Sequence, residues 1–191
     1  MKETPFDRRF LEKYPQGVCI GFFDEMRLGL QGQVRRVWAP KGEDVEQAQQ
    51  FVFAWSYLIL QVQPLAKKIK WDWVPSMKAV PMAEVIARWK QEGTDLLIGD
   101  HAKSHKSAVV KATGIKMAHI PKYSPQLDPA ERIFEEIRRE IEGEVYETLA
   151  QKQAAVDRWL TQLASEPERI ASLACWSWIE AQLKSFSPNQ P

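Results

Sequence analysis

The sequence is poor in the features that mark disulfide-rich, secreted or membrane-spanning proteins. It has only two cysteines among 191 residues, Cys19 and Cys175, and two thiols so far apart predict neither a disulfide scaffold nor a zinc site. No stretch approaches the roughly 18 apolar residues that a membrane span requires, and the charged N-terminus lacks the apolar core of a signal peptide. We therefore expect a cytoplasmic protein with reduced thiols and no membrane partner.

Net charge is also nearly absent, at +1, so the composition as a whole carries no nucleic-acid signature. The distribution of charge is more informative, because the segment from His101 to Leu127 holds five lysines and three histidines but no acid. Such a segment can contact phosphates, and a solvated basic face is the alternative. The length and the 45% hydrophobic content suit one domain with a sizeable core.

Two aspartates stand where short apolar runs stop. Residues 18–23 lead into Asp24, and residues 96–99 lead into Asp100. Short apolar runs of this kind predict buried strands, and a carboxylate at the end of one is costly unless a cation compensates its charge. This pattern indicates a site for a divalent metal ion.

A third carboxylate follows a turn that contains two prolines. Asp128 is a good N-cap, Pro129 suits the first helical position, and Glu131 falls in the first turn of the predicted helix. Glu131 can therefore join the two aspartates as a metal ligand. The alternative is a capping box, in which its side chain bonds to the N–H of Asp128 and has no further role.

Hydrophobic patterning predicts an α/β chain in the order three strands, helix, strand, helix, strand, helix. The predicted strands are residues 18–24, 51–62, 69–73, 95–100 and 115–120, with 25–33 as an edge or turn and 34–38 as an added short strand. The predicted helices are residues 82–93, 104–112 and 129–141, and the chain is helical again from residue 147, with a second helix starting at Pro167. The strand at 95–100 is expected to be parallel to the first. Trp71 and Trp73 are expected to pack on the sheet, with base stacking as the alternative.

Four segments together resemble the catalytic domain of DDE transposases, in particular the bacterial insertion-sequence members of the mariner-like superfamily. In chain order they are FFDEMRLGL, RRVWAPKG, IGDHAKSHKS and IPKYSPQLDPAERIFEEIRR. The resemblance implies an α/β, ribonuclease H-like fold, a mixed five-stranded sheet flanked by helices. It further suggests a lead-in helix at residues 1–17, a catalytic domain at 18–145, and a helical extension at 146–191 packed on the same domain or on a partner subunit.

The resemblance also implies a reaction: metal-dependent cleavage of DNA at the ends of an insertion sequence, then transfer of the freed 3′-hydroxyl into target DNA. Asp24, Asp100 and Glu131 would be the catalytic residues and would hold two Mg²⁺ ions, for which Mn²⁺ can substitute. His105 matches a family histidine that could face DNA or order the site. The expected DNA contacts are Arg35, Arg36, Lys41, His101, Lys103, His105, Lys106 and Lys122.

The sequence departs from the family pattern in two ways. Relatives commonly have Asn at the positions of His101 and Asp128, and the 30 residues between Asp100 and Glu131 are about one helical turn fewer than usual. Two other readings therefore stay open beside an active transposase: an inert or domesticated DNA- or protein-binding scaffold, and a general ribonuclease H-like nuclease.

The family also implies partners. Mariner-like transposases usually carry helix-turn-helix domains ahead of the catalytic domain, whereas 17 residues precede the first predicted strand. We therefore expect end recognition to come from a separate helix-turn-helix chain or a missing N-terminal domain, with a homodimer as a further expectation. The resemblance places the protein in the bacterial cytoplasm, associated with the nucleoid.

Overall fold

The computed structural model describes residues 18–31, 38–46, 50–141 and 143–186. Five strands form one mixed sheet in the order β3-β2-β1-β4-β5. They are β1 (Ile20–Gly29), β2 (Trp55–Gln63), β3 (Lys68–Val74), β4 (Leu96–Gly99) and β5 (Lys116–His119). Strands β1, β2 and β3 pair antiparallel, whereas β4 and β5 add in parallel to β1. The predicted five-stranded mixed sheet is confirmed.

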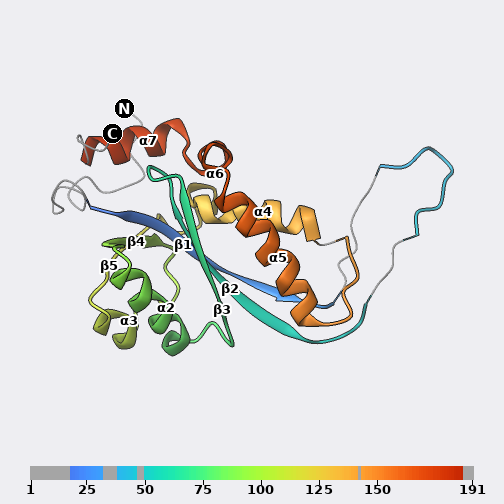
Figure 1. Ribbon diagram of the computed structural model, residues 1–191, viewed down its shortest axis with the longest axis horizontal. Helices are drawn as coiled ribbons and strands as arrows, with labels where there is room; N and C mark the ends of the chain where they lie inside the picture. Colours follow the sequence, from blue (N-terminus) through green and yellow to red (C-terminus); the bar gives the residue numbers. More distant parts are fainter. Residues whose placement is uncertain (1–17, 32–37, 47–49, 142, 187–191) are drawn as a thin grey trace.

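Helices cover both faces of this sheet (Figure 1). One face carries α2 (Ala79–Gln91) and the short α3 (Ala108–Ala112). The other carries α4 (Pro129–Ile141), α5 (Leu149–Ala164), α6 (Pro167–Ala174) and α7 (Ser177–Phe186), and a 3-10 turn, η1 (Pro125–Leu127), leads directly into α4. None of the helices in the described ranges is long and apolar enough to cross a membrane.

The pleat of β1 decides which way its acidic residues face. Successive side chains of a strand alternate between faces, and Phe22, Met26 and Leu28 are buried on the face that packs against α4 to α7. Phe23 is buried on the opposite face with α2. The side chain of Asp24 therefore lies on the face of the sheet that α4 covers, whereas that of Glu25 lies on the face that α2 and α3 cover.

The register of the two central parallel strands brings both aspartates to one edge. Ile20 pairs with Leu96 and Phe22 pairs with Ile98. Continuing that register by two residues places Asp24 beside Asp100, just beyond the end of β4. The two acids are 76 residues apart in sequence but adjacent in space, because β4 runs parallel to the first half of β1 and ends beside Asp24.

The C-terminal helices pack on this sheet. Val156, Leu160 and Ile170 are buried in one cluster with residues of β1, β2 and α4, and α7 buries Ile179 and Leu183 against β1, β4 and β5. The indole N–H groups of two β3 residues, Trp71 and Trp73, both donate to Oδ1 of Asp157 at 2.9 Å. These tryptophans are therefore used in packing, as expected, and their indole nitrogens are occupied.

Several predicted boundaries are wrong. Residues 25–29 continue β1 rather than forming an edge or turn, β2 begins at Trp55 rather than at residue 51, and Trp38 is not in a strand. The helix predicted at 104–112 comprises only 108–112, and the second C-terminal helix is two helices, α6 and α7. The lead-in helix at 1–17 and residues 34–37 lie outside the described residues.

Candidate active site

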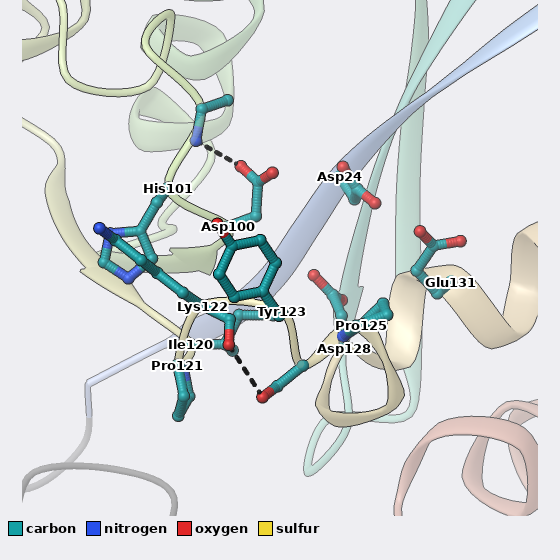
Figure 2. Close-up of a pocket in the computed structure, with 12 residues that line it drawn as sticks. Asp24, Asp100, His101, Ile120, Pro121, Lys122, Tyr123, Pro125, Asp128 and Glu131 are labelled. Atoms are coloured by element: carbon teal, nitrogen blue, oxygen red, sulfur yellow. Dashed lines mark hydrogen bonds between the residues drawn. The ribbon is translucent and has the colours of Figure 1, made fainter.

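Four carboxylates line one pocket where β4 ends beside the middle of β1 (Figure 2). Its volume is about 470 Å³, and its acidic lining consists of Asp24 from β1, Asp100 after β4, and Asp128 and Glu131 at the start of α4. The three predicted ligands are thus brought to the same pocket by two adjacent strands and one helix. Asp128 is an acid that the sequence analysis assigned only to helix capping.

Asp24 is partly buried among other acids. Burial raises the pKa of its carboxyl group most, followed by the charge of Glu25, with smaller contributions from Glu131 and Asp100, and the result is a pKa of about 8. The hydrogen bond from the N–H of Glu25 to Oδ1, at 2.8 Å, opposes this shift but does not cancel it. A carboxylate in such a place needs a cation or a proton.

Asp100 is more open and is held by its own loop. Its side chain is 54% exposed, and Oδ1 accepts a hydrogen bond from the N–H of Ala102 at 2.7 Å. Nδ1 of His105 lies 3.0 Å from the same oxygen. The backbone carbonyl of Asp100 accepts from Nδ1 of His119 at 2.7 Å. These contacts fix both the backbone and the carboxylate of Asp100.

His105 links the two strands beneath the pocket. It is 1% exposed, and its Nε2 lies 2.8 Å from Oε1 of Glu25 while Nδ1 faces Asp100. Burial by itself would lower the pKa of His105, but the hydrogen bond and charge of Glu25, with the charge of Asp100, outweigh it and raise that pKa. An imidazolium donates from both ring nitrogens and so satisfies both acids. The prediction that His105 contacts DNA is wrong because the side chain is buried; its ordering role stays a prediction.

Glu131 points to the pocket from the first turn of α4 rather than closing a capping box. The N–H of Asp128, which a capping box would use, donates to the carbonyl of Pro125 at 2.9 Å. The ion-pair contact of Glu131 is long, 3.9 Å from Oε2 to a guanidinium nitrogen of Arg138. The carboxylate is therefore not committed to the helix cap, and it is half-buried at the pocket wall.

Asp128 is the most buried of the four acids, at 2% exposure. Its Oδ1 accepts from the N–H of Ala130 at 2.9 Å, so it caps α4 as predicted. Its Oδ2 is buried and has no hydrogen-bond partner among the described residues. Burial first, and then the charges of Asp24, Glu131 and Asp100, raise the pKa of Asp128 well above its usual range. The sequence feature that could have pointed to Asp128 as a fourth acid of the pocket is the Asp itself, because relatives commonly have Asn at this position.

Only some of the predicted DNA contacts lie at this pocket. His101 and Lys122 line it. Lys106 contacts His101, with Nζ 2.8 Å from Nδ1. Lys41 and Lys103 are exposed but do not line the pocket, and Arg35 and Arg36 lie outside the described residues.

Sequence reasoning also missed a residue at the mouth of the pocket. Tyr123 is 98% exposed and lines the pocket in front of the acids (Figure 2). Its φ of 59° lies in the left-handed region, which costs a bulky residue about 1–3 kcal/mol. No local pattern predicted that conformation, because the turn residue with positive φ is neither Gly nor Asn.

The oxygen donors of this pocket are of the kind that Mg²⁺ prefers. The pKa values of Asp24 and Asp128 are raised by burial and by neighbouring acids, which is where a cation would be most stabilising. No three His, Cys, Asp or Glu residues of the described ranges come together at the spacing of a metal site. Mutual repulsion of the carboxylates opposes their close approach. The residue types therefore fit a divalent cation, whereas the carboxylates are more widely spaced than the ligands of a metal site.

A family model of the DDE superfamily endonucleases matches residues 20–151, well over half of the chain. The chain belongs to this family. The matched range contains β1 to β5 and α4, and therefore all four acids of the pocket. No curated protein sequence matches the chain.

Solved structures with the same fold as this family member include those of Mos1 transposase. The Mos1 paired-end complex with the left transposon end has a TM-score of 0.65 at 13% identity, covering 88% of this chain and 54% of that one. The mariner Mos1 paired-end complex with Mg has a TM-score of 0.61 at 16% identity, with 93% and 55% covered. The catalytic domain of Mos1 mariner transposase has a TM-score of 0.51 at 13% identity, with 82% and 81% covered. The chain thus spans about half the length of the two complex chains, and the likeness shows the ribonuclease H-like fold.

Proposed function

We propose that this chain is the catalytic domain of a transposase that cleaves DNA phosphodiesters and transfers strands at the ends of an insertion sequence. One observation carries the proposal: the parallel register of β1 and β4 sets Asp24 beside Asp100, and α4 directs Glu131 into the same pocket. Membership of the DDE superfamily endonucleases supports the reaction class. The Mos1 complexes with transposon ends support DNA as the substrate.

Asp24, Asp100 and Glu131 would hold divalent Mg²⁺ or Mn²⁺, in the two-ion arrangement expected from the sequence. When bound, such ions activate the attacking water or 3′-hydroxyl and stabilise the departing oxygen. The structural relative solved with Mg supports a divalent cation. The burial of Asp24 among other acids supports it as a residue that a cation would stabilise.

The other residues of the site bind and orient. His105 holds Asp100 in place from beneath and neutralises Glu25. His101 and Lys122, which line the pocket, would contact DNA phosphates. Recognition of a specific end sequence is assigned to a separate helix-turn-helix chain or a further domain, and pairing of two ends to a homodimer.

A cleavage assay tests this function. The parent protein should nick a supercoiled plasmid in Mg²⁺ or Mn²⁺ and be inactive in EDTA. Asp24→Asn and Asp100→Asn should lose activity by about 10³-fold or more, whereas the nearby Asp95→Asn, outside the pocket, should retain it. Equal nicking by all three variants would refute the assignment.

The same assay separates the alternative functions. Divalent-dependent nicking without joining of 3′-hydroxyl ends would favour the general nuclease, and folded protein without any nicking would favour the inert scaffold.

A further inference from the structure

Asp128 has one oxygen that the fold does not use. The side chain is 98% buried, its Oδ1 caps α4 through Ala130, and its Oδ2 has no hydrogen-bond partner among the described residues. Buried polar atoms are nearly always paired, so an orphaned carboxylate oxygen needs an explanation. The cap does not supply one, because an Asn or a Ser would cap the helix with its single oxygen equally well.

The orphaned oxygen belongs to the acidic pocket. Asp128 lines that pocket with Asp24, Asp100 and Glu131. Figure 2 shows its carboxylate below that of Asp24 and beside Glu131. The charges of those three acids all act on Asp128, so the four groups share one electrostatic environment.

A proton would neutralise the carboxylate of Asp128 but would leave the charges of Asp24, Glu131 and Asp100 unrelieved around this oxygen. A divalent cation would satisfy it and would also relieve the repulsion among the acids. We propose that Asp128 is a fourth carboxylate ligand of the divalent-cation site, an inference that rests on the proposed function.

A fourth carboxylate would strengthen cation binding in this chain, because the charge and number of oxygen ligands set affinity for hard cations. It would also give a reason for Asp at a position where Asn would serve the helix. The consequence is tighter retention of the cation before any DNA is bound.

Mn²⁺ binding without DNA tests this inference. Titration calorimetry of the full chain should give a Kd about tenfold or more higher for Asp128→Asn than for the parent. Asn keeps the capping oxygen, so the fold should be intact, and the metal-free Tm should not fall. Asp128→Ser keeps a cap by a different group and should show the same loss of affinity. The matched control is Glu135→Gln, which lines the adjoining hollow but not the acidic pocket.

A thiolate variant adds a readout that a structural role would not produce. Asp128→Cys should bind the thiophilic ion Cd²⁺ with an ultraviolet thiolate-to-metal band beyond that of the parent, whose Cys19 and Cys175 serve as background. Parent-like Mn²⁺ affinity in both Asp128→Asn and Asp128→Ser would overturn the inference. If that occurs while Asp24→Asn abolishes binding, only the role of Asp128 fails. If the parent itself binds no Mn²⁺, the proposed function fails with it.

Discussion

At the scale of single residues, the raised pKa of Asp24 makes a prediction for the metal-free protein. Its folded pKa of about 8 exceeds the ordinary value of 3.8 for an aspartate, so between these values the folded state holds a proton that the unfolded state releases. The stability from this group is therefore present at low pH and lost as pH rises from about 4 to 8. The charges of Glu25, Glu131 and Asp100 also raise the pKa of Asp24 and so act in the same direction.

Asp24→Asn should remove most of that pH dependence. In EDTA at pH 8 the variant should melt about 5 °C higher than the parent, with a smaller difference near pH 4. Calorimetric scans across this range check the prediction. A lower Tm for Asp24→Asn at pH 8 would mean that the carboxylate stabilises the fold through contacts rather than straining it.

His105 is predicted to act through Asp100 and to compensate the buried Glu25. His105→Leu leaves Glu25, whose side chain is 8% exposed, without its partner and should cost about 3 kcal/mol of unfolding free energy. Adding Glu25→Met removes the uncompensated charge and should recover much of that loss. The double variant should nevertheless stay slow in DNA cleavage, because Asp100 lacks its support. Denaturant unfolding and nicking rates measured together check this; a double variant restored in both would show a purely structural role.

At the scale of elements, the start of α4 decides which glutamate serves the site. Glu135 pairs with Arg132 at 2.7 Å, and Glu136 also contacts Arg132, at 3.1 Å. Among the residues that the structure describes, the ion-pair contact of Glu131 is the long one of 3.9 Å to Arg138, and Glu131 lies in the first turn, where the η1 turn fixes its position.

Glu131→Gln should therefore abolish DNA cleavage while changing the unfolding free energy by less than about 0.5 kcal/mol. Glu135→Gln and Glu136→Gln should cut DNA as the parent does. Nicking rates and melts of the three variants decide the assignment. Activity retained in Glu131→Gln but lost in Glu135→Gln would place the third ligand one helical turn further along.

Sequence patterns predicted the elements that carry the three ligands, and the reason is local. Apolar runs ending in Asp24 and Asp100 mark buried strands, and the Asp128–Pro129 pair marks a helix start. The predicted edge or turn was wrong at residues 25–29 because the glycines of this stretch outweighed the alternation of buried Met26 and Leu28 around exposed Arg27. The break between α6 and α7 has neither Gly nor Pro, so packing rather than local sequence sets it.

The rest of the site depends on tertiary placement. Burial of His105 between Glu25 and Asp100 follows from the strand register, which brings residues 80 apart into contact. The orphaned oxygen of Asp128 follows from how deeply α4 seats on the sheet. Neither can be inferred from residue spacing alone.

At the scale of the whole molecule, charge predicts how the chain binds DNA. The net charge is +1, and Lys103, Lys106 and Lys122 are exposed near the site. Phosphate contacts carry no base information. The isolated chain should therefore bind short duplexes weakly, with little dependence on sequence and with affinity that falls steeply as salt rises. Fluorescence anisotropy at several salt concentrations checks this, and tight, salt-insensitive binding to one sequence would contradict it.

The central claim is that Asp24, Asp100 and Glu131 together hold the divalent cations of a DNA-cleaving site. Anomalous diffraction from a crystal soaked in Mn²⁺ tests it most directly, because the manganese positions are seen independently of activity. We expect anomalous peaks in the acidic pocket within ligand distance of all three carboxylates, and their loss in a soaked Asp24→Asn crystal. Manganese bound elsewhere, with none between these carboxylates, would contradict it.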